Sequence, residues 1–146
     1  MNGRVLMAAS LAVLAVFGIA LWWFQTRAFY EEFAVDAIRV GDVEVPVTDF
    51  QGIDAKTSPI KLRACMKVAP EDFDNAEPAP NATPLVAQSW FNCFNAKALS
   101  RALEAADAKA YLAAADEFDG TLRIIAVYPD GRAYMWRQLT EEFANQ

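Results

Sequence analysis

The amino-acid sequence predicts an α+β fold: one N-terminal transmembrane helix in residues 1–28, then a small periplasmic domain in residues 29–146 with an antiparallel sheet and one or two helices. Two observations predict it. A long uncharged apolar run lies near the start of the 146-residue chain. Segments of alternating apolar and polar residues, separated by proline and glycine turns, follow this run and indicate antiparallel strands.

The apolar run is Val5–Phe24, and it contains no charged residue. About 20 helical residues span the hydrocarbon core of a bilayer, so the run is long enough to cross one. Trp22 and Trp23 lie near its C-terminal end, and indole rings favour the membrane interface, where we expect them to set the depth of the helix. A cleaved signal peptide and a buried core helix are the alternatives. Cleavage after Ala20 would leave an apolar new N-terminus, and no polar face interrupts the run, so we expect an uncleaved anchor.

Small residues follow one stripe of this helix at spacings of four and three. They are Ala8, Ala12, Ala15 and Gly18. Such a stripe lets a second transmembrane helix approach closely, so it predicts contact with helices of a larger membrane complex. The alternative is that alanine is simply common in membrane helices.

Beyond the anchor, the first half of the domain is predicted from its apolar periodicity. Phe29 and Phe33, four residues apart, indicate that the helix continues to residue 33. Residues 38–47 and 60–68 alternate and are predicted strands, with residues 49–54 as a loop around Gly52. Pro70–Pro84 is acidic and proline-rich, which is typical of a surface loop.

The second half begins with Asn95, a residue that favours helix N-caps, followed by an apolar stripe over residues 99–106. Residues 111–115 are alanine-rich and predict a second short helix. Two strands, 121–128 and 133–139, flank the turn Pro129–Arg132, because proline presets φ and Gly131 accepts positive φ.

Four segments of the domain resemble a family of small, single-pass inner-membrane proteins of alphaproteobacteria, an uncharacterised family. The segments are residues 49–54, 58–65, 90–94 and 126–136. The resemblance implies a bacterial inner membrane and a pattern of two cysteines. It brings no catalytic residues.

The two cysteines, Cys65 and Cys93, are predicted to form one disulfide in an oxidising compartment. That pairing would place the domain in the periplasm and the N-terminus in the cytoplasm. Three alternatives remain open: two reduced core thiols, a redox-active pair, or a copper(I) site with Met66 or Met135.

Composition excludes several kinds of chemistry. The chain has no histidine, which removes Ser-His-Asp and Cys-His catalysis, histidine-ligated haem and histidine-bearing zinc sites. From Gln25 onward, 12 basic residues face 19 acidic ones, a net charge of −7 that argues against nucleic-acid binding. The six glycines are isolated, so no phosphate-binding loop is predicted. We therefore expect no enzyme activity, no cofactor and no metal.

These observations predict a non-catalytic accessory subunit of an inner-membrane complex, such as a respiratory or photosynthetic electron-transfer complex. The predicted partners are the lipid bilayer, transmembrane helices of that complex and a basic soluble protein such as a cytochrome c, steered by the acidic domain. The charge is equally explained by solubility alone. A membrane-anchored assembly factor and an independent periplasmic binding module are the alternative functions.

Overall fold

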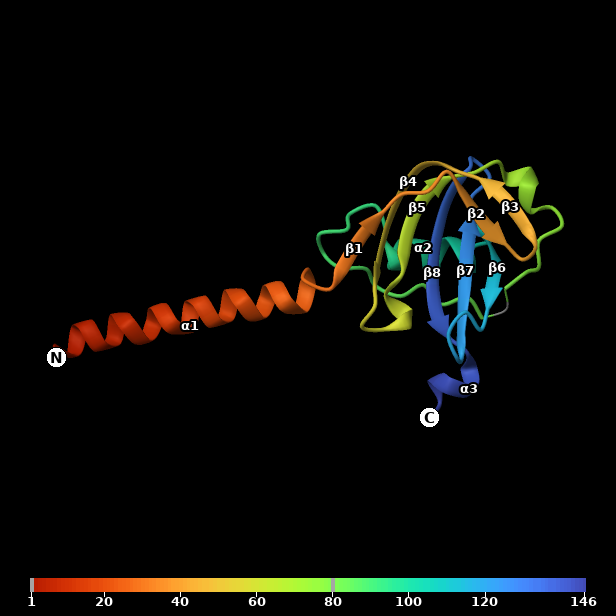
Figure 1. Ribbon diagram of the computed structural model, residues 1–146. Helices are drawn as coiled ribbons and strands as arrows, with labels where there is room; N and C mark the ends of the chain where they lie inside the picture. The colour runs from red at the N-terminus through yellow and green to blue at the C-terminus, as the bar shows by residue number, and fades with distance from the viewer. Residues whose placement is uncertain (1, 80) are drawn as a thin grey trace. The chain divides into compact units, whose positions relative to one another are not determined.

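The computed structural model describes residues 2–79 and 81–146, and it divides the chain into two compact units, one ending at Tyr30 and the other spanning Glu31–Gln146. The first unit is the helix α1 (Gly3–Thr26), and none of its residues is buried. By length and composition it is able to cross a membrane. Figure 1 shows the elements of both units.

The second unit is an α+β domain, as the sequence predicted. Its six-stranded sheet has the order β1 (Tyr30–Phe33), β4 (Thr48–Ala55), β5 (Arg63–Lys67), β8 (Arg132–Leu139), β7 (Thr121–Val127), β6 (Lys109–Ala115). The neighbouring pairs from β4 to β6 are antiparallel. A separate hairpin joins β2 (Ala37–Val40) to β3 (Val43–Pro46). The helices are α2 (Ala96–Glu104) and α3 (Glu141–Ala144), with 3₁₀ turns at Pro59–Lys61 and Pro70–Phe73.

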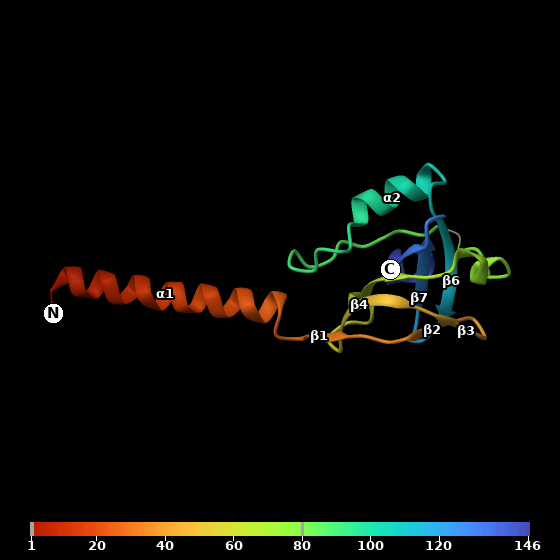
Figure 2. The ribbon, with the colours of Figure 1, turned by 90° about the horizontal axis from the view of Figure 1, so that it is seen from above.

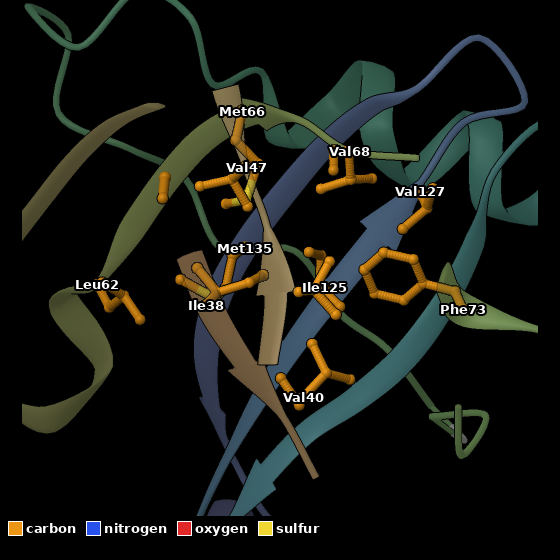
Figure 3. Close-up of a cluster of buried hydrophobic side chains, with 14 residues drawn as sticks. Ile38, Val40, Val47, Leu62, Met66, Val68, Phe73, Ile125, Val127 and Met135 are labelled. Carbon is orange, nitrogen blue, oxygen red and sulfur yellow. The ribbon is translucent and has the colours of Figure 1, made fainter. Parts of the chain in front are cut away.

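The β2–β3 hairpin covers one face of the sheet, and α2 lies on the other side (Figure 2). Hairpin side chains such as Ile38 and Val40 pack onto the sheet, where the same cluster contains Met66 of β5, Ile125 of β7 and Met135 of β8 (Figure 3). Burial of this apolar surface is the main force that holds the hairpin on the sheet.

The second face of the sheet is also buried. Trp136 on β8 is fully buried, and the ring of Phe94 packs edge-on against it at a centroid distance of 6.3 Å. Leu99 and Ala102 of α2 are buried too, as the predicted stripe required, whereas Ala106 is exposed beyond the end of the helix. The central strands are therefore covered on both faces, which is why the burial of β7 does not alternate.

Several local predictions are confirmed. The side chain of Asn95 accepts a hydrogen bond from the backbone N–H of Ala98 at 3.0 Å and caps α2. Residues 121–127 and 132–139 form the two strands around the predicted turn, where Gly131 has a φ of +94°. The proline-rich segment is largely exposed but buries Phe73, and its Pro80 lies outside the described residues.

Other predictions are wrong because nonlocal pairing overrides local propensity. The helix ends at Thr26, and residues 30–33 instead form β1, the strand that pairs with β4. Residues 49–54 are not a loop but most of β4, where Gly52 leaves room for the rings of Phe33 and Phe50 to pack 5.3 Å apart. The alanine-rich residues 111–115 belong to β6, which pairs with β7.

Two predicted strands also have different bounds. Residues 38–47 contain a turn, because Gly41 takes a φ of +59° and separates β2 from β3. Residues 60–68 begin with a 3₁₀ turn, and the strand proper covers only Arg63–Lys67.

The turn between β7 and β8 gives a test of the fold. At Gly131, an added Cβ would lie 2.7 Å from the carbonyl oxygen of Val68, whereas at Gly41 it would meet open space. Both positions have positive φ, so Gly41→Ala measures the conformational cost alone, about 1 kcal/mol. Gly131→Ala adds a clash with backbone, and we expect a loss of about 2 kcal/mol or more in urea unfolding. Equal losses for the two variants would contradict this packing.

Candidate functional site

The structure joins Cys65 and Cys93 in a disulfide, with a Cα–Cα distance of 6.2 Å. Cys65 lies on β5 in the middle of the sheet, and Cys93 lies in the segment before α2. This arrangement agrees with the predicted disulfide and leaves no thiol for the alternatives of reduced cysteines or a copper(I) site. Met66 and Met135 are in the core under the β2–β3 hairpin, on the opposite face of the sheet from Cys65.

The disulfide is the first of three side-chain attachments, made by Cys93, Arg63 and Gln138, that hold residues 74–95, hereafter the crossover segment, against the sheet. Backbone hydrogen bonds also join Glu77 and Ala79 of this segment to β6. Buried Arg63 makes the second: its Nε donates to the carbonyl oxygen of Leu85 at 2.9 Å, and its Nη2 donates to that of Val86 at 3.3 Å. The sequence predicts a strand at Arg63 but not this role, because no local pattern reveals that this face of the strand is covered.

Gln138 on β8 makes the third attachment. Its Oε1 accepts hydrogen bonds from the backbone N–H of Thr83 at 2.8 Å and from Trp136 Nε1 at 3.0 Å. Its Nε2 donates to the carbonyl oxygen of Asn81 at 3.0 Å. Both polar ends of a buried amide are therefore satisfied, and the side-chain attachments hold the crossover segment at Asn81, Thr83, Leu85, Val86 and Cys93.

A groove of about 510 Å³ opens between the end of the sheet and the crossover segment. One side is formed by residues 32–34, at and just beyond the end of β1, and by residues 50–52 of β4. The other side is formed by residues 90–93, which the disulfide holds in place. Phe91 is buried, whereas Trp90 is partly exposed with its ring 6.4 Å from that of Phe91. The groove is aromatic, and among its lining residues Glu32 is the charged one.

Two arginines lie directly opposite each other on neighbouring strands, at the edge of the face that carries the β2–β3 hairpin. Arg123 on β7 pairs in register with Arg137 on β8, and each side chain is only 13% exposed. Glu117 bridges them, with contacts of 3.2 Å to Arg123 and 3.1 Å to Arg137, and Asp54 lies 2.9 Å from Arg137. Burial lowers the pKa of Arg123, Glu117 opposes this shift, and Arg137 adds to it. The network ties β4, β7 and β8 to the turn before β7.

The predicted anchor residues all lie on α1. Ala8, Ala12, Ala15 and Gly18 are exposed along the helix, and Trp22 and Trp23 are exposed near its C-terminal end. No residue of α1 is buried within its own unit, and within residues 2–79 and 81–146 the structure shows no helix in contact with this stripe. The roles of these residues therefore stay predictions.

Fold and site together define a small, disulfide-bonded α+β domain that follows a helix long and apolar enough to cross a membrane. The sequence model of a family of unknown function, DUF6446, matches residues 35–146, and the chain belongs to that family. This confirms the expectation of an uncharacterised family. Comparisons with curated proteins and with solved structures find no match.

The disulfide predicts a large loss of stability on removal. Cys65 and Cys93 close a loop with a sequence separation of 28, and chain entropy assigns about 3–4 kcal/mol to a crosslink of that length. We expect the double variant Cys65→Ala/Cys93→Ala to lose that amount in urea unfolding. Dithiothreitol should lower the stability of the wild type to that of the double variant and leave the variant unchanged. A wild type insensitive to the reductant would contradict the assignment.

The arginine network predicts a specific effect at Glu117. The variant Glu117→Gln leaves two guanidinium groups opposite each other without their shared carboxylate, and we expect a loss of about 1 kcal/mol, larger at low salt. The control is Glu77→Gln at an exposed carboxylate, which should change stability by less than about 0.5 kcal/mol. In an Arg137→Gln background, Glu117→Gln should cost less. An unchanged cost there would show that the bridge is not a coupled network.

Proposed function

We propose that this chain is a non-catalytic accessory subunit of a bacterial inner-membrane protein complex, with the N-terminus in the cytoplasm and the domain in the periplasm. The observation that carries the proposal is α1, a helix of 24 residues that is long and apolar enough to cross a membrane and of which no residue is buried. Such a surface is stable in lipid or against other transmembrane helices. The small-residue stripe is compatible with both environments, because it also lets a second helix approach closely. The proposed origin in alphaproteobacteria follows from the sequence resemblance.

The periplasmic orientation is supported by the disulfide. Disulfides persist in oxidising compartments and are rare in the cytosol, so a domain fixed by Cys65–Cys93 fits the periplasm. The acidic balance of the domain also suits a surface that steers a basic soluble protein such as a cytochrome c. A respiratory or photosynthetic electron-transfer complex is the host we propose.

Purification of the tagged full-length chain from native membranes in mild detergent tests the proposal. We expect recovery of one intact complex at a constant ratio of its members, measured by mass spectrometry. Recovery of the chain with substoichiometric, unassembled client proteins would instead favour a membrane-anchored assembly factor. Recovery of the chain alone would favour an independent binding module.

The helix stripe gives a matched pair of variants for the same purification. Ala15→Leu adds bulk within the stripe, so it should weaken association with the complex by about tenfold. Ala20→Leu adds the same bulk on a different face of α1 and should leave recovery unchanged. Both variants should unfold in urea like the wild type, because neither alters the domain. Equal recovery of the complex with both variants would count against the stripe as the contact face.

A further inference from the structure

We propose that β1 and the adjoining groove bind an extended segment of a partner membrane protein by strand addition, and that this segment carries a lysine or arginine beside an apolar side chain. The inference rests on the proposed function, because it names the surface and the kind of segment through which the domain meets its complex. Three features of the domain carry it: the open edge of the sheet, the position of the groove and the charge of β1.

The two edges of the sheet differ. The β6 edge is covered, since Leu112 donates its backbone N–H to Glu77 at 2.8 Å and Ala79 donates to Ala110 at 3.0 Å. Within residues 2–79 and 81–146, no strand lies beyond β1, the last strand of the sheet at the other edge. The outward backbone groups of an edge strand are a template for a further strand.

The groove borders β1, so side chains of a strand added beside β1 would lie next to it. Residues 32–34 and residues 90–93 form its two sides, and its volume of about 510 Å³ holds several side chains. In strand addition, main-chain hydrogen bonds give affinity and pockets for alternate side chains give specificity. The partly exposed Trp90 and the ring of Phe33, 36% exposed, offer an apolar surface to one such side chain.

Charge decides between a partner and a second copy. β1 carries Glu31 and Glu32 in succession, so antiparallel pairing of two copies over all four residues of β1 would place Glu31 of one copy opposite Glu32 of the other, which is unfavourable. Glu31 has an ion pair to Lys56 at 3.7 Å, with both side chains highly exposed. No basic residue lines the groove beside Glu32. An incoming strand with a lysine or arginine therefore complements this edge.

The position of β1 in the chain points to a membrane partner. Only residues 27–29 lie between the end of α1 and the start of β1. When α1 is in a bilayer, β1 follows it after a very short connection. The nearest segments that could pair with β1 are then the extramembrane segments of the same complex.

Two pairs of matched variants test the proposal in the full-length chain, purified from native membranes. Glu32→Lys reverses the charge at the groove, and Glu44→Lys makes the same change at an exposed position on β3. Asn92→Trp fills the groove from an exposed position on its rim, and Asn75→Trp adds the same ring on another exposed turn. We expect Glu32→Lys and Asn92→Trp to lower recovery of the complex by about tenfold, and the two control variants to recover it fully. Urea unfolding of all four establishes that they are folded.

A photo-crosslinking amino acid at position 34 and amide hydrogen exchange identify the occupant. We expect crosslinks to one partner segment that contains a lysine or arginine, and slower exchange of residues 31–34 in the complex than in the free chain, because strand addition protects backbone amides. Full recovery of the complex with both groove variants, unchanged exchange of β1, or crosslinks to a second copy of this chain would each overturn the inference while leaving the accessory-subunit proposal standing. Absence of any stoichiometric complex with the wild type would instead overturn the proposed function, and the inference with it.

Discussion

The structure depends on one constraint, which is that the central strands of its sheet are apolar on both faces and need two covers. Ala64 and Cys65, neighbours on β5, point to opposite faces and are both buried. The first cover is the β2–β3 hairpin, which is short and folds on itself through a tight turn. The second is the crossover segment with α2, which travels much further. Without an attachment such a long segment would retain much conformational entropy, and the disulfide, Arg63 and Gln138 are placed where they restrain it.

The same arrangement explains why, among the residues that the structure describes, no further strand or segment is seen to pair with the outer edge of β1. The crossover segment begins along β6 and covers that edge, then crosses the second face and reaches the disulfide before α2. Its turn at residues 90–93 borders a groove beside β1 and leaves the outer side of that strand open. The fold therefore presents an aromatic groove with one acidic residue, beside the last strand of the sheet, in the part of the domain that is nearest in sequence to α1. This is the physical basis of the proposed partner binding.

The sequence predicted the features that local chemistry determines. The apolar helix, the Asn95 cap and the Pro129–Arg132 turn each depend on a few neighbouring residues, and each was found. β1, β4 and β6 were missed because their identity depends on strands far along the chain. Residues 111–115 show this clearly: alanine favours helix in isolation, but pairing with β7 and burial of Ala113 decide for strand.

The candidate site was predictable only in part, for a related reason. Two cysteines in one small domain suggested a disulfide, but its role in fixing the crossover segment required the topology. The groove and the arginine network were not predictable, because Arg123 and Arg137 become neighbours only through the register of β7 with β8. Glu117 gives no local signal that it will bridge them.

Amide hydrogen exchange of the full-length chain before and after reduction of the disulfide tests the account most directly. If the disulfide fixes the cover of the second face, reduction should accelerate exchange in residues 85–95 and at the start of α2 by a larger factor than in β7 and the β2–β3 hairpin, where only the loss of global stability acts. Unchanged exchange in residues 85–95, or a uniform acceleration throughout the domain, would contradict the view that this bond holds one cover on a sheet already stabilised by the other.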